Sequence, residues 1–113
     1  NYTYINNVKI KILNSSLKSF GLRSNSSRNI FIADHSKIEI RDAEFDAVDT
    51  PFETSNSELV VVDANVLNSD TFVSGKASRI VLVKVSGTSN NVLDAIDSDS
   101  ELLVRYSDVS SFK

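Results

Sequence analysis

The chain has 113 residues, 41% hydrophobic and 24% charged, which is the composition of a folded domain, and we predict a single domain over residues 1–113. It has no cysteine, which excludes disulfides and thiolate metal sites. The net charge of −3 argues against a nucleic-acid partner, and no apolar run approaches the roughly 20 residues that a membrane-spanning helix needs. Because the chain begins with Asn1 and shows no signal segment, we expect a processed chain or a piece of a larger protein.

Charges of opposite sign are separated along the chain. Residues 1–41 hold seven basic and two acidic residues, a net charge of +5. Residues 42–113 hold five basic and thirteen acidic residues, a net charge of −8. If structural units stack in chain order, one end of the stack is basic and the rest is acidic.

A unit of about 21 residues recurs along the chain and dominates its pattern. Each copy opens with a serine and continues with aliphatic residues at alternate positions, and the first aliphatic residue stands at 38, 59, 80 and 102. A fixed period in this range is typical of stacked, solenoid-like units. The four copies begin Ser36-Lys37-Ile38-Glu39-Ile40, Ser57-Glu58-Leu59-Val60-Val61, Ser78-Arg79-Ile80-Val81-Leu82 and Ser100-Glu101-Leu102-Leu103-Val104.

Each unit predicts two or three short strands. Alternating apolar residues indicate a strand with one face inward, and no stretch has helical periodicity. The small residues Ala43 and Ala64, three positions after the second aliphatic residue, predict a bend. A second apolar segment follows at Pro51-Phe52, Phe72-Val73 and Val92-Leu93. We therefore predict an all-β solenoid of about five coils, in which each strand pairs in parallel with its counterpart one period later.

The first coil is predicted to carry an insertion. Residues 10–20 match residues 38–48 at a constant offset of 28, which leaves about seven extra residues in an inserted loop at 21–29. Insertions in solenoids emerge as loops, often on the binding face. Arg23, Asn25 and Arg28 are therefore candidate binding residues, since guanidinium groups clamp carboxylates and phosphates. The last coil, residues 100–113, is incomplete.

The serine-led openings and the continuations Asp42-Ala43-Glu44-Phe45 and Asp63-Ala64-Asn65-Val66 resemble the right-handed parallel β-helix of the pectin-lyase-like superfamily. The resemblance covers residues 6–113 and implies a right-handed coil. It says little about function, because proteins of this fold include polysaccharide lyases and hydrolases, phage tailspikes, adhesins and non-catalytic modules. This chain is far shorter than the enzymes. It also lacks their asparagine ladder, because the offset places Asp42, Asp63, Lys84 and Tyr106 at the position of Asn14.

Two other repeat folds and one non-repeat fold fit the sequence less well. A pentapeptide-repeat solenoid has a similar number of residues per turn, but its five-residue sub-period fails outside two units. A leucine-rich repeat needs a Leu-x-x-Leu-x-Leu-x-x-Asn pattern that is absent. A β-sandwich does not explain the constant spacing.

Catalytic chemistry has little support in the sequence, and no catalytic residue is assigned. His35 is the only histidine and adjoins Asp34, but neighbours on a strand point to opposite faces. No Gly-x-Ser-x-Gly motif exposes a nucleophilic serine. Acidic clusters at 44–53 and 94–101 admit glycosidic acid/base chemistry, although a solvated acidic turn is the simpler interpretation.

Calcium is the one cofactor that the sequence suggests. Asp97, Asp99 and Glu101 alternate along one segment and offer carboxylate oxygens of the kind Ca²⁺ prefers. Lyases of the pectin-lyase-like superfamily often use calcium, so the resemblance adds to this expectation. No EF-hand pattern is present, because the stretch contains no glycine.

From these observations we expect a non-catalytic structural or interaction module that presents its faces to a protein or glycan partner. The alternatives are a carbohydrate-active enzyme, or a fragment of one, and an assembly unit of a fibre or adhesin. Uncapped end coils expose unpaired backbone groups, so a homo-oligomer formed through the ends or through a lateral face is also expected. We expect an extracellular or virion-surface location rather than a cytoplasmic one.

Overall fold

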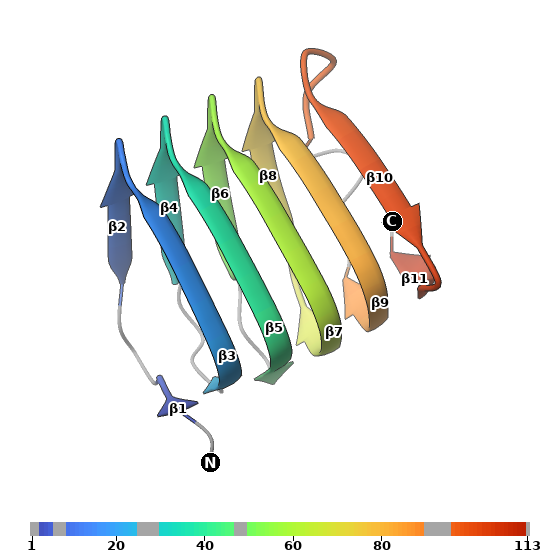
Figure 1. Cartoon of the computed structure of the whole chain (residues 1–113). Helices are drawn as coiled ribbons and strands as arrows, with labels where there is room; N and C mark the ends of the chain where they lie inside the picture. Colours follow the sequence, from blue (N-terminus) through green and yellow to red (C-terminus); the bar gives the residue numbers. More distant parts are fainter. Residues whose placement is uncertain (1–2, 6–8, 25–29, 47–49, 90–95, 113) are drawn as a thin grey trace.

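In a computed structural model the chain forms a β-solenoid of about four turns, in which every strand pairs in parallel (Figure 1). The structure describes residues 3–5, 9–24, 30–46, 50–89 and 96–112. In Figure 1 one set of strands rises behind and a second set descends in front, and the chain advances from β2 (Ile10–Leu13) to β10 (Glu101–Arg105), which makes the coil right-handed. The all-β solenoid predicted from the 21-residue period is confirmed, although it has about four turns and not the predicted five.

Two parallel sheets form the walls of the solenoid. Sheet A runs in the order β1-β3-β5-β7-β9-β10, with β11 also paired to β9, and sheet B runs β2-β4-β6-β8. The short strands of sheet B are β2 (Ile10–Leu13), β4 (Phe31–Asp34), β6 (Phe52–Ser55) and β8 (Val73–Lys76). The strands of sheet A are β1 (Thr3–Tyr4), β3 (Ser16–Ser24), β5 (Lys37–Asp46), β7 (Glu58–Ser69), β9 (Arg79–Ser89), β10 (Glu101–Arg105) and β11 (Asp108–Phe112).

The register between coils follows the sequence period and builds continuous inward columns. Leu17, Ile38, Leu59, Ile80 and Leu102 lie side by side in neighbouring strands. Ile38, Leu59 and Ile80 are fully buried, because each is covered by a coil on either side. Aromatic rings fill the wider part of the interior, where Phe31 stacks on Phe52 with ring centroids 5.4 Å apart, and Phe45 and Phe72 meet Phe52 edge-on.

Among the described residues, the coils turn at two columns of corners that use left-handed backbone. At the corner between sheets B and A, Asn14, His35, Asn56 and Ala77 have φ between 48° and 50°. The long strands of sheet A bend at a second column, formed by Asp42, Asp63, Lys84 and Tyr106 with φ between 51° and 60°. The small residue predicted at a bend, such as Ala43 or Ala64, directly follows this second corner and is buried. The left-handed conformation is costly for residues other than glycine, asparagine and aspartate, so Ala77, Lys84 and Tyr106 store strain that the stacked coils hold in place.

The predicted offset of 28 for the first coil is wrong. β3 pairs with β5 so that Leu17 lies opposite Ile38 and Leu22 opposite Ala43, an offset of 21. Residues 21–24 therefore belong to β3 and not to an inserted loop, while residues 25–29 lie outside the described residues. Asn14 corresponds to His35 at the first corner, and Gly21, with φ 78°, corresponds to Asp42 at the second.

Candidate functional site

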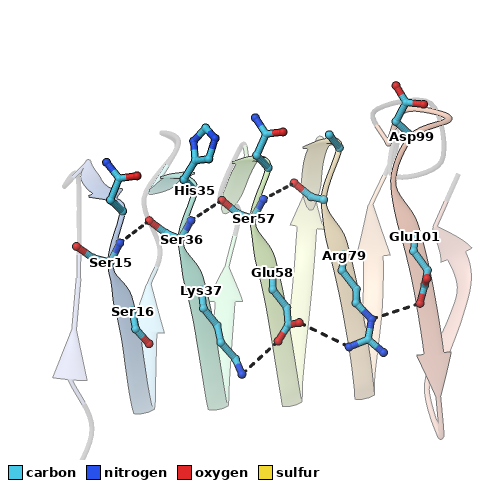
Figure 2. Close-up of a pocket in the computed structure, with 14 residues that line it drawn as sticks. Ser15, Ser16, His35, Ser36, Lys37, Ser57, Glu58, Arg79, Asp99 and Glu101 are labelled. Carbon is cyan, nitrogen blue, oxygen red and sulfur yellow. Dashed lines mark hydrogen bonds and ion pairs between the residues drawn. The ribbon is translucent and has the colours of Figure 1, made fainter.

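The first corner carries a ladder of serine hydroxyls along the solenoid axis. The backbone N–H groups of Ser15, Ser36 and Ser57 each donate to the Oγ atom of the serine one coil on, at 3.0, 3.1 and 3.3 Å (Figure 2). The N–H of Ser78 continues the ladder to Ser100 Oγ at 2.9 Å. Each of the first four hydroxyls donates to a main-chain carbonyl two residues back in its own coil, as from Ser57 to Ser55 at 2.8 Å. The hydroxyls of this serine ladder are therefore committed to the fold, which leaves them poor candidates for nucleophiles.

Next to the serine ladder, charged side chains of alternating sign form a second row on the outer face of sheet A. Lys37 Nζ lies 3.2 Å from Glu58 Oε1, Arg79 Nη1 lies 3.6 Å from Glu58 Oε2, and Arg79 Nε lies 3.3 Å from Glu101 Oε1. Figure 2 shows these four side chains joined end to end across four strands. We call Lys37, Glu58, Arg79 and Glu101 the charge ladder. Exposed ion pairs contribute little to stability, so we read the ladder as a feature of the surface.

An open groove of about 980 Å³ follows this corner of the solenoid. Its floor is the serine ladder, and one wall is the charge ladder. The other wall is the corner column, in which Asn14, His35 and Asn56 are exposed. The groove therefore offers amide, imidazole and charged groups at a repeat of about 4.8 Å, the spacing of neighbouring strands.

Beyond the charge ladder, the outer face of sheet A turns apolar. Val81 pairs with Val60 on one side and with Leu103 on the other, and Val62 pairs with Val83, all on the side of the strands that faces away from the core. All five side chains are half-buried. We call Val60, Val62, Val81, Val83 and Leu103 the aliphatic strip. The same two columns continue toward the N-terminal end as Glu39 and Arg41, an ion pair at 3.2 Å, and then as Lys18 and Phe20.

The predicted binding residues of the loop at 21–29 do not form a described site. Arg23 lies on β3, and its guanidinium donates to the carbonyl oxygen of Asp42 at 2.8 Å and to Asp42 Oδ1 at 3.1 Å. It thereby bridges two coils at the second corner, where the chain bends. Asn25 and Arg28 lie outside the described residues.

The three acidic residues suggested for calcium are placed on different features. The carboxylate Oδ1 of Asp97 accepts hydrogen bonds from Ser100 Oγ at 2.7 Å and from the N–H of Ala77 at 3.2 Å. Glu101 belongs to the charge ladder, and Asp99 is exposed at the turn. In the described ranges, no group of three or more His, Cys, Asp and Glu side chains is arranged to hold a metal ion.

Asp97 replaces a main-chain acceptor at the point where the repeat lengthens. In the earlier coils the corner N–H donates to a main-chain carbonyl of the next coil, as from His35 to Ser55 at 3.1 Å and from Asn56 to Lys76 at 2.9 Å. The step from Ser78 to Ser100 is one residue longer, and there the N–H of Ala77 donates to the Asp97 side chain. The pKa of this carboxyl lies below its ordinary value of 3.8, mainly because the hydroxyl of Ser100 donates a hydrogen bond to it.

His35 and Asp34 do interact, against the expectation that neighbours on a strand face apart. Nδ1 of His35 lies 2.7 Å from Oδ1 of Asp34. The expectation failed because His35 is the left-handed corner residue, with φ 49°, and not a strand residue. Both side chains are more than half exposed, at 62% and 52%, so the pair is solvated, and of the two only His35 lines the groove.

The charge ladder and the aliphatic strip were not singled out from the sequence. A usable signal was present, because residues 37, 58, 79 and 101 alternate in charge at the repeat spacing. The outward Val60 and Val81 also break the rule that exposed strand positions are polar.

Among the described residues, no helix is long and apolar enough to cross a membrane. No protein-family model, curated protein or solved structure matches this chain.

Proposed function

We propose that this solenoid is a non-catalytic interaction module that binds a protein partner through the outer face of sheet A. The observation that carries the proposal is the aliphatic strip, bordered on one side by the charge ladder and on another by Glu39 and Arg41. An apolar centre with a charged rim is the usual anatomy of a protein interface. The parallel coils also support the proposal that the chain belongs to the pectin-lyase-like superfamily.

The chemistry of the face suits binding better than catalysis. The carboxylates of the charge ladder are all ion-paired, with Glu58 held between Lys37 and Arg79. The serine hydroxyls beside them are engaged in hydrogen bonds to main-chain groups. The parallel sheet supports such a surface, because its register places equivalent side chains of adjacent coils side by side.

A glycan is the second candidate ligand, and a different feature favours it. The groove places the uncharged side chains of Asn14 and Asn56 in one exposed column with His35 between them. Amide and imidazole groups in a row supply donors and acceptors of the kind that bind sugar hydroxyls.

The two candidates are separated by placing a photo-crosslinking residue at position 81 in the aliphatic strip. The matched control carries it at position 32, a half-buried outward position on sheet B. A specific protein adduct from position 81 and none from position 32, in an extract of the source organism, supports the protein partner. Binding on a glycan array that Asn56→Ala abolishes overturns the protein proposal in favour of the glycan. Absence of both results overturns both candidates.

A further inference from the structure

The outer face of sheet A, up to its second corner, is a regular grid of side chains. Its outward columns cross the neighbouring strands β5, β7, β9 and β10. The first column is the charge ladder, which reads basic, acidic, basic, acidic from Lys37 to Glu101. The second and third columns are aliphatic on β7 and β9, where Val60 pairs with Val81. The grid therefore has a charged column along one side of an apolar centre.

The order of charges in the ladder is complementary to itself. Consider a two-fold axis that lies in the plane of the face, parallel to the strands and midway between β7 and β9. It reverses the order of the strands, so the column of charges in one copy meets the reversed column of a second copy. Glu58 then faces Arg79 of the second copy, and Lys37 faces Glu101 of the second copy. In the other columns the valines of β7 face the valines of β9.

Other two-fold arrangements of this face fit less well. An axis centred on one strand sets the charged residue of that strand against its own copy. An axis midway between β5 and β7 sets Arg41 against Val62. An axis midway between β9 and β10 sets Arg105 against Val83. An axis perpendicular to the strands sets Glu58 against Val62. Of these arrangements, only the axis between β7 and β9 pairs opposite charges and apolar side chains at the same time.

The central pairs do not depend on either end of the stack. β7 and β9 each have a described coil on both sides, so Glu58, Arg79 and the valines keep their places whatever precedes or follows the chain. At the rim, Arg41 comes near Arg105 of the second copy, but Glu39 neutralises Arg41 at 3.2 Å. The twist of facing sheets rotates their strands by about 30° relative to each other, which separates rim residues more than central ones.

We propose that the protein partner of the aliphatic strip is a second copy of this chain, in a two-fold dimer whose sheets A pack face to face. The proposal rests on the proposed function and names the partner of the same face. From the spacing of strands and of residues along them, the grid measures roughly 20 Å on each side, or about 400 Å² per copy. A standard interface buries about 800 Å² per partner, so we expect a dimer that dissociates on dilution.

The first test is sedimentation of the purified chain from micromolar to millimolar concentration. We expect a reversible equilibrium between monomer and dimer. V81K places a charge in the apolar centre and should abolish the dimer, whereas I32K, a matched change on the outer face of sheet B, should not. Melting curves confirm that both variants remain folded. A monomer at every concentration, or a dimer that V81K does not weaken, overturns the proposal.

A second test exchanges the signs of the charge ladder and leaves the aliphatic strip unchanged. The exchanged chain carries K37E, E58K, R79E and E101K. It keeps the alternation of signs within the chain, so it should fold and dimerise with itself. A mixed pair with wild type sets like charges against each other and should form at least about tenfold more weakly.

Mixed pairs are measured by energy transfer between fluorophores. The chain has no cysteine, so K76C on the exposed side of sheet B takes one label on each kind of chain. Wild-type chains should pair with wild-type chains, and exchanged chains with exchanged chains. Mixed pairs that form as readily as like pairs overturn the two-fold arrangement.

The dimer and the proposed function fail in distinguishable ways. A wild-type chain that stays monomeric, together with an adduct between position 81 and a different protein, overturns the dimer and leaves the proposed function standing. An adduct between position 81 and a second copy supports both proposals. Absence of any adduct from position 81 overturns both.

Discussion

The backbone N–H of Ser36 donates to the hydroxyl of Ser57 at 3.1 Å, and both groups are buried. At this corner the chain leaves the flat sheet, and the N–H of Ser36 bonds to a side chain instead of a carbonyl of the next coil. The hydroxyl is fixed in turn, because it donates to the carbonyl of Ser55 at 2.8 Å. The recurrent serine thus lets the parallel ladder continue around the turn without an orphaned donor.

Replacing Ser57 by alanine should destabilise the chain by about 1–3 kcal/mol, because it leaves the buried N–H of Ser36 without an acceptor. Ser15→Ala is the matched control. Ser15 occupies the same corner, but it is exposed, and no described residue donates to its hydroxyl. Urea unfolding of both variants measures the difference. Equal losses in the two variants would contradict a ladder role for the hydroxyl.

The fold was predictable because its two main signals, the spacing of aliphatic residues and the small residues at the bend, are local and recur along the chain. The 21-residue period fixed which aliphatic residues share a column, and Ile38, Leu59 and Ile80 do so. The bend at Ala43 and Ala64 was also predicted correctly. The first coil misled the prediction because it is more polar inside. Ser19 pairs with Ile40 in an inward column. Because Ser19 is polar, the apolar residues alone align the first coil with the second at the wrong offset of 28.

The candidate site was less predictable, because it depends on which residues share the outer face. Glu58 contacts both Lys37 and Arg79 although each is 21 residues away in the chain. Such contacts depend on the register between neighbouring strands, so they can be recognised in the sequence only when the repeats are aligned correctly. The sequence suggests Asp97 as a calcium ligand because it alternates with Asp99 and Glu101. Its hydrogen bond to Ala77, in the coil before, was not visible there.

Ala77→Gly should stabilise the chain by about 0.5–1 kcal/mol. Ala77 has φ 48°, a left-handed conformation that costs an alanine about 1–2 kcal/mol and glycine almost nothing. The hydrogen bond from its N–H to Asp97 is kept by glycine. Ala64→Gly is the control, since Ala64 is buried and follows the left-handed residue Asp63. That control should lower the melting temperature, and a fall in both variants would contradict strain at Ala77.

Thr54→Val should also stabilise the chain, by about 1 kcal/mol, because it removes a buried hydroxyl that lacks a partner. Thr54 is 2% exposed, and among the described residues its Oγ1 atom has no hydrogen-bond partner. Valine has nearly the same shape, so the packing against Gly75 is preserved. Thr71→Val is the control, because the Thr71 hydroxyl is exposed and donates to Asp70. Differential scanning calorimetry compares the two, and an unchanged or lower melting temperature for Thr54→Val would count against the argument.

Asp97→Asn should remove part of the acid sensitivity of the chain. The pKa of the Asp97 carboxyl is held below its ordinary value of 3.8, mainly by the hydroxyl of Ser100. A carboxyl with a depressed pKa in the folded state contributes stability above its unfolded pKa, and that contribution is lost as the pH falls through the folded value. Wild type should therefore exceed Asp97→Asn in stability at neutral pH, and the gap should close below about pH 4.

The measurement for Asp97 is the melting temperature of both proteins from neutral pH to about pH 2, below the ordinary pKa of a carboxyl group. Asp99→Asn, an exposed change two residues away in the same turn, serves as the control. A gap between wild type and Asp97→Asn that stays constant across this range would show that the Asp97 charge does not stabilise the turn. The asparagine retains an oxygen that accepts from Ala77 and Ser100, so the comparison isolates the charge from the hydrogen bonds that hold the longer corner in place.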